Sequence, residues 1–88
     1  MKELKILKVA GHSSVQAVSG SIVKSIEDNK EVELRAIGAS STNQMAKATA
    51  IARGILASKG LDLLVRVGFG ETEIDGEKRT MMIFKLMY

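Results

Sequence analysis

The chain has 88 residues, which is enough for one folded domain and too few for two independent cores. Hydrophobic residues make up 45% of it and charged residues 26%, a balance typical of globular rather than disordered proteins. It has no cysteine, which excludes a disulfide framework, a thiolate nucleophile and a cysteine-based metal site.

The sequence shows no sign of membrane insertion or export. No apolar run approaches the roughly 20 residues that a helix needs to span a bilayer. The first residues, Met1 to Ile6, include an acid and lack the apolar segment of a signal peptide. We therefore expect a cytoplasmic protein.

The net charge of +3 is unevenly distributed along the chain. Residues 34–70 contain five basic side chains and one acidic one, whereas residues 71–77 contain four acidic side chains and no basic one. A basic body with an acidic tip can steer an anionic partner to one side of a protein. The alternative is that these charges form ordinary solvated faces.

Hydrophobic periodicity predicts the first three elements in chain order. A strand over residues 4–10 ends at a glycine, and the hydroxyl of Ser13 or Ser14 is suited to capping a helix N-terminus. Apolar residues then recur at helical spacing to about Asp28. Alternation of apolar and polar residues predicts a second strand over 31–37.

The second half of the chain predicts one helix and a hairpin. A glycine-and-hydroxyl turn at 38–43 leads into an alanine-rich helix from about residue 41 to 58. Unbroken alternation predicts a third strand over 61–69. Asp75-Gly76 is a hairpin signal, and the fourth strand follows over 78–88.

The element order βαβαββ defines the fold class. We predict an α/β protein of the α+β two-layer sandwich type, with a mixed four-stranded sheet and two helices on one of its faces. The first crossover should join parallel strands. Residues 1–88 form a single domain.

The sheet face away from the helices is expected to carry several apolar side chains, enough to mark a contact surface. Self-association through this face, most simply as a homodimer, is one interpretation. In the other, long lysine and arginine side chains cover the face. The apolar residues expected there are Leu7, Val9, Ile37, Leu64, Met81, Ile83 and Met87.

The sequence offers little support for catalysis. His12 is the only histidine, and no nearby acid would orient it as a base for Ser13 or Ser14, which turn and capping roles explain. The acids of residues 71–77 would form at most a weak site for a hard cation. The stretch 68–70, Gly-Phe-Gly, precedes no helix, so we expect a bend or bulge rather than a dinucleotide site. We predict no enzymatic activity, no cofactor and no metal site.

Nucleic-acid binding is a more specific hypothesis than catalysis, and the residues themselves support it. Both predicted helices begin at glycine-and-hydroxyl turns, whose free N–H groups suit phosphate oxygens. Parallel neighbouring strands would bring both turns to one edge of the sheet. Lys47 follows Asn43 by one turn on the same helix face, whereas Arg53 lies about 120° away. In the alternative interpretation, the serines are only caps and the lysine is only solvated.

The composition also indicates the mode of binding. Aromatic residues make up only 3% of the chain, which disfavours base stacking. Binding should therefore involve the nucleic-acid backbone, depend on salt and show weak sequence preference.

Residues 35–54 read RAIGASSTNQMAKATAIARG, and this run resembles the signature of the stage V sporulation protein S family: AIGA, then NQ, then K, then AIARG. The resemblance extends to residues 7–9, 18–21 and 75–80. The family is similar in fold to Alba-type chromatin proteins, which have the same element order. The resemblance implies a bacterial regulator linked to sporulation or cell-cycle control. It also implies a homodimer or tetramer that binds DNA or RNA.

The resemblance implies candidate contact residues as well. Alba-like domains use basic residues in the first loop, at the start of the second helix and on a mobile hairpin. The first loop here lacks the usual lysine and proline, and the hairpin tip is acidic, so only the second-helix position is carried over. Arg53 has an alternative structural role, in bridging subunits or capping a carbonyl. The candidates are Asn43, Gln44, Lys47 and Arg53, with Arg35 and Arg66 expected on the open sheet face.

A protein-interaction or scaffold module in sporulation or cell-cycle regulation is the alternative function. In that case the apolar sheet face and the acidic hairpin would contact a protein partner without direct binding of nucleic acid. Glu71, Glu73 and Glu77 would then matter more than Lys47.

Overall fold

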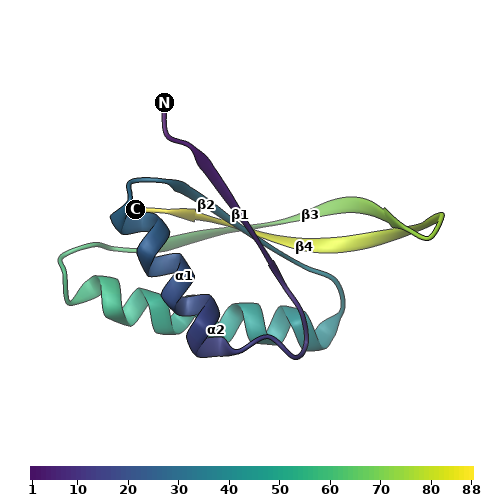
Figure 1. The fold of residues 1–88 in the computed structure, drawn as a ribbon, viewed down its shortest axis with the longest axis horizontal. Helices are drawn as coiled ribbons and strands as arrows, with labels where there is room; N and C mark the ends of the chain where they lie inside the picture. Colours follow the sequence, from purple (N-terminus) through teal and green to yellow (C-terminus); the bar gives the residue numbers. More distant parts are fainter.

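The structure is a computed structural model that describes residues 1–88, and its elements follow the predicted βαβαββ order (Figure 1). The elements are β1 (Leu4–Val9), α1 (Val15–Glu27), β2 (Glu31–Ala36), α2 (Ala39–Ala57), β3 (Leu64–Ile74) and β4 (Glu77–Met87). The sheet has the strand order β1-β2-β4-β3, in which β1 and β2 are parallel and β4 is antiparallel to both of its neighbours. The predicted two-layer α+β fold is confirmed.

Both helices lie on one face of the sheet, and the core fills the space between the two layers (Figure 1). Leu34, in β2, is fully buried between the helices and the neighbouring strands. Two alanines of α2, Ala48 and Ala52, are also fully buried, because small side chains let this helix lie close to the sheet. Neither helix is long and apolar enough to cross a membrane.

The two helices begin differently. Ser14 caps α1 as predicted, because its side chain accepts a hydrogen bond from the backbone N–H of Ala17 at 3.2 Å. The second helix begins at Ala39, two residues earlier than expected, and Gly38 gives it no side-chain cap. The hydroxyl of Ser41 instead donates to the Ile37 carbonyl at 2.5 Å. The predicted hydroxyl turn is therefore mostly the first turn of the helix, with its hydroxyl groups folded back onto the backbone.

The third strand runs from Leu64 to Ile74, so it begins three residues later and ends five residues later than its apolar alternation indicated. Its pairing with β4 is one-to-one throughout, so the predicted bend or bulge at 68–70 is wrong. Gly70 has a different role, because a Cβ atom there would lie 2.7 Å from side-chain atoms of both Met81 and Ile83. The absent side chain makes room for its neighbours on β4 without breaking the strand.

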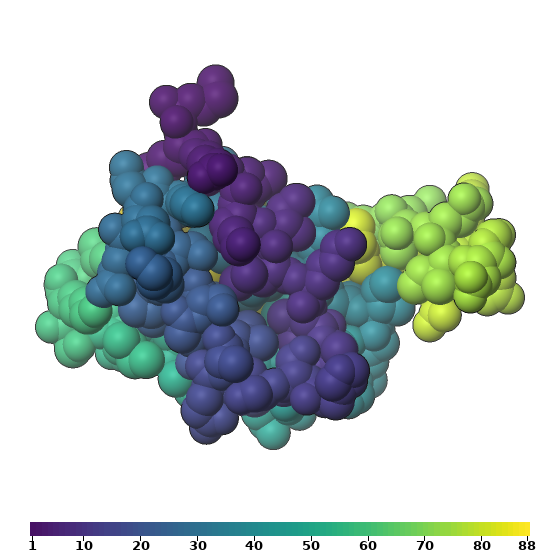
Figure 2. Space-filling model, viewed as in Figure 1, coloured from purple at the N-terminus to yellow at the C-terminus, as the bar shows by residue number.

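The β3–β4 hairpin projects beyond the rest of the molecule as an arm, residues 70–81 (Figures 1 and 2). Strand β2 pairs with β4 only over Met82–Leu86, so the outer part of the hairpin has no third strand beside it. The arm ends in the predicted two-residue turn, where Asp75 and Gly76 have φ angles of 51° and 80°. Positive φ at both positions matches the twist of a tight hairpin.

The open face of the sheet differs from the prediction in β1. Leu7 and Val9 point toward the helices, because the parallel register pairs them with Leu34 and Ala36, and directly paired residues lie on the same side of a sheet. Ile37 lies just beyond the end of β2. The open face carries Leu4, Ile6 and Lys8 from β1 instead. The other four predicted residues, Leu64, Met81, Ile83 and Met87, do lie there.

Candidate nucleic-acid interface

The two turns that precede the helices meet at one edge of the sheet. This prediction is confirmed, because β1 and β2 are parallel and their carboxyl ends lie side by side. The turns are in direct contact: a Cβ atom at Gly11 would lie only 2.6 Å from the hydroxyl oxygen of Ser40. The side chain of Gln44 holds the same junction by donating to the Ser13 carbonyl at 3.0 Å. We call this region the carboxyl edge.

Gly11→Ala should destabilise the domain by about 1 kcal/mol, because the added methyl group would displace the exposed Ser40 hydroxyl from its position against Gly11. Urea denaturation would measure the loss. In a Gly11→Ala/Ser40→Ala double variant, most of the stability should return, because the nearest atom at Ser40 is then the Cβ, at 3.2 Å. Equal losses in the single and double variants would show that this contact does not limit stability.

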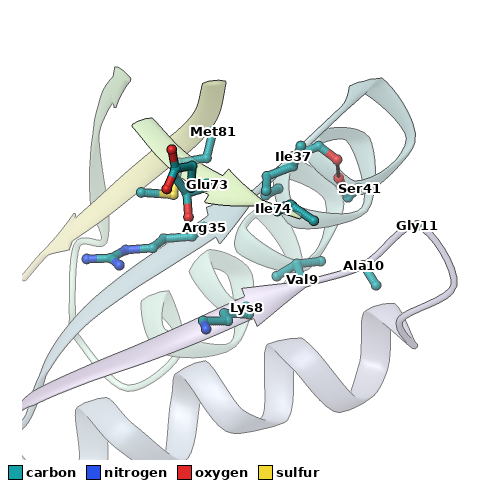
Figure 3. A pocket seen from close by; sticks show the side chains of 12 residues that line it. Lys8, Val9, Ala10, Gly11, Arg35, Ile37, Ser41, Glu73, Ile74 and Met81 are labelled. Atoms are coloured by element: carbon teal, nitrogen blue, oxygen red, sulfur yellow. Dashed lines mark hydrogen bonds between the residues drawn. The ribbon is translucent and has the colours of Figure 1, made fainter. Parts of the chain in front are cut away.

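A concavity of ≈ 550 Å³ lies between the arm and the carboxyl edge (Figure 3). Lys8 and Arg35 line it from neighbouring strands, and their side chains extend to the same side in Figure 3. Glu73 and Ile74 line it from the arm. Ser41, in the first turn of α2, also contributes to the wall. The concavity therefore joins the carboxyl edge to the open face of the sheet.

Five cations lie on the open side of the sheet. One of them, Arg79, is on the arm; the other four, one from each strand, we call the basic row: Lys8, Arg35, Lys85 and Arg66. Lys8 pairs with Arg35 across β1 and β2, and Lys85 pairs with Arg66 across β4 and β3. Glu33 is paired with Lys85 in the register and forms an ion pair with Arg35, with 2.6 Å between the Arg35 Nη2 and Glu33 Oε2 atoms. The other three cations of the row have no carboxylate oxygen within 4.0 Å. Most of the positive charge on this face is therefore unneutralised.

The four candidates on α2 lie in the other layer. Asn43 and Lys47 are exposed, and Gln44 is half-buried at the carboxyl edge. Arg53 points to another side of the helix, where its Nη2 atom lies 3.9 Å from Oδ1 of Asp62. The six predicted residues therefore form two groups, because Arg35 and Arg66 lie on the opposite face of the sheet as predicted.

Sequence reasoning missed two members of the basic row, Lys8 and Lys85. Each alternates with apolar residues of its strand, which places it on a sheet face opposite the core. That signal shows the face but not the neighbour, so the side-by-side position of Lys8 and Arg35 follows only from the strand register.

The acidic tip is partly balanced by two basic residues that follow it in the chain and lie on the facing strand. Strand pairing sets Lys78 opposite Glu73, and Arg79 lies opposite Thr72. Glu71 is opposite Thr80 and has no cation within 4.0 Å. The arm is therefore mixed in charge, and none of its four exposed acids has a cation within 4.0 Å.

The groups at this interface are suited to holding anions. No three His, Asp or Glu side chains come together in a way that could hold a metal ion, and His12 is exposed at the turn after β1. Lysine, arginine and backbone N–H groups are the donors that bind phosphate oxygens in nucleic-acid complexes.

A mixed four-stranded sheet with two helices on one face and a projecting hairpin defines an Alba-like domain. The solved structure of Alba from Thermoplasma volcanium matches it with a TM-score of 0.69, over 96% of this chain and 100% of that chain. The two sequences are 12% identical, so the likeness is one of fold. At the level of sequence, residues 5–88 match the model of the family described as Stage V sporulation protein S (SpoVS). The chain belongs to the Stage V sporulation protein S family, as its signature run indicated.

Proposed function

We propose that this protein is a cytoplasmic regulator of the stage V sporulation protein S type that binds nucleic acid, acts as a homo-oligomer and has no catalytic role. The observation that carries the proposal is the basic row, which crosses all four strands and leads into the concavity beside the arm. The Alba-like fold and the family membership support the same function.

The dimensions of the basic row suit a polyanion. Neighbouring strands lie about 4.8 Å apart, so four strands spread the cations over about 14 Å. A DNA duplex carries one negative charge per about 1.7 Å of its axis, so several phosphates fall within that span. Three of the four cations lack an ion pair within the chain and so lose no internal partner when they bind phosphate.

The open face also indicates what kind of contact to expect. The two phenylalanines, Phe69 and Phe84, point to the helix side of the sheet. Bases therefore have no aromatic ring to stack on at the basic row, and binding should involve phosphates. Asn43, Gln44, Lys47 and Arg53 remain predicted contacts for nucleic acid that extends around the carboxyl edge to α2.

Fluorescence-anisotropy titration with labelled duplex DNA and duplex RNA tests the proposal. If about four phosphates are contacted, the affinity should fall about 100-fold between about 50 mM and about 200 mM salt. Lys47→Glu should weaken binding if α2 contributes, and Lys24→Glu, on α1, is the control with the same change in charge. No binding at low salt, or an affinity that salt does not change, would contradict the proposal.

A protein-interaction module remains the second candidate, because the four acids of the arm are all exposed and project away from the body. In that case, charge reversal at Glu73 and Glu77 should abolish capture of a protein partner, whereas Lys47→Glu should not. On this alternative the wild-type chain should bind neither DNA nor RNA in the anisotropy titration.

A further inference from the structure

The outer edge of β1 carries backbone groups that form no hydrogen bond within the chain. The Glu31 N–H donates to the Glu3 carbonyl at 2.9 Å, and this bond fixes the direction of the backbone groups in the parallel ladder with β2. Because those groups alternate along a strand, the odd-numbered residues of β1 face β2. The N–H and C=O groups of the even-numbered residues face outward. We call this set the free edge: Leu4, Ile6 and Lys8.

The free edge ends at the turn after β1. There Ser13 occupies both backbone groups of Ala10: its hydroxyl accepts from the Ala10 N–H at 2.9 Å, and its own N–H donates to the Ala10 carbonyl at 3.0 Å. Figure 2 shows β1 in purple and α1 in blue on the face toward the viewer, with no other element in front of them. Three alternate positions of β1 can therefore pair with a further strand.

A groove of ≈ 260 Å³ runs between the free edge and α1. Leu7 and Val9 line it from β1, and Val18 lines it from the helix. Leu7 and Val18 point toward the core but are only half-buried, because nothing covers them on this side. Two more helix residues of the groove, Ala17 and Ser21, are small and exposed, so they leave room beside the strand. Domains that bind a peptide as an added strand take its alternate side chains into pockets of this kind.

The charge at the free edge indicates which strand would bind there. Lys5 and Lys8 have no carboxylate oxygen within 4.0 Å. Pairing with β1 of a second copy would gather both lysines of each chain, and lysine on an edge strand is a common device against such pairing. An acidic strand would instead place a carboxylate beside Lys8, and opposite charges on neighbouring strands stabilise their pairing.

We propose that the free edge of β1 is a docking site for an extended, acidic segment of a partner protein, which adds a fifth strand to the sheet. Apolar side chains at every second position of that segment would enter the groove beside α1. The acidic side chains between them would lie on the side of the open face, next to Lys8. This site is separate from the arm, and the inference does not depend on nucleic-acid binding.

Amide hydrogen exchange measured by NMR tests the added strand, with the blocked synthetic peptide Glu-Val-Glu-Leu-Glu-Val-Glu as the probe. In the protein alone, the amide hydrogens of Leu4, Ile6 and Lys8 should exchange about 100-fold faster than those of Lys5 and Leu7, which are bonded to β2. Excess peptide should slow the three fast hydrogens by about tenfold or more. This effect at alternate residues is specific to strand addition.

Two variants test the edge and the groove separately, by titration of the labelled peptide. Ile6→Pro removes one outward N–H, a change that an edge strand tolerates, and Ala17→Trp fills the groove from an exposed helix position. Each should raise the dissociation constant of the peptide by about tenfold or more. Gln16→Trp is the matched control, because Gln16 is exposed on the same helix and does not line the groove. Circular dichroism would establish that each variant is folded.

Three results would overturn the proposal. The first is an affinity for the peptide that neither Ile6→Pro nor Ala17→Trp changes. The second is equal binding of a peptide in which lysine replaces every glutamate, since the acidic peptide should bind about tenfold more tightly. The third is slow exchange at the free edge in concentrated protein without peptide, which would assign the edge to a second copy of the chain. These measurements contain no nucleic acid, so their failure is distinct from a failure to bind DNA or RNA.

Discussion

Replacing Lys8 by glutamate and Arg35 by glutamine in one variant is expected to weaken nucleic-acid binding by about 100-fold or more at low salt. The two side chains are neighbours across β1 and β2 at the floor of the concavity. The loss of two charge-assisted phosphate contacts at about 1.5–3 kcal/mol each accounts for a change of this size. Glutamine at position 35 keeps a donor for Glu33, so the partner of the 2.6 Å ion pair is not left without a hydrogen bond.

Anisotropy titration against duplex DNA and duplex RNA would measure the effect. The slope of the logarithm of affinity against the logarithm of salt concentration should also become shallower, by the amount that corresponds to about two phosphate contacts. The matched control is Lys24→Glu/Lys59→Gln, which changes the net charge equally. Lys24 and Lys59 pair with Asp28 and Glu27 near the C-terminal ends of the helices, away from the carboxyl edge. Equal losses in the two double variants would mean that only net charge matters and that the basic row is not the site.

Leu34→Ala is expected to destabilise the domain by about 3 kcal/mol, a large part of the stability of a small protein. Leu34 is fully buried, and its strand pairs with β1 on one side and with β4 on the other. The smaller side chain would leave a cavity between the sheet and both helices that the surrounding strands cannot close. Urea denaturation at a fixed protein concentration would measure the change in the free energy of unfolding.

Leu64→Ala provides the comparison, because it removes the same atoms from a leucine that is 54% exposed on the open face. Its effect should stay within about 0.5 kcal/mol. Similar losses at the two positions would show that Leu64 and the open face around it are buried in solution.

Local pattern was sufficient for most of the fold. Alternation defined β2 because one of its faces is buried, and helical spacing defined α1. The Asp75-Gly76 turn requires positive φ angles, which explains why the two residues signal a hairpin on their own. The ends of the elements were less accurate: β3 continues to Ile74 because strand pairing with β4, and not apolar content, keeps the arm extended.

The sequence by itself determined the element order, the hairpin, the family signature and the types of side chain available for binding phosphate. Only the tertiary structure decided which of those side chains are neighbours. Lys8 and Arg35 are 27 positions apart in the chain, and it is the parallel register that pairs them on the open face and turns Leu7 toward the core. The 78% exposure of Phe69 was also a tertiary outcome, since alternation alone cannot show where the helix layer ends. The physical reason is the same in both cases: periodicity is local, whereas register and coverage depend on contacts between residues distant in sequence.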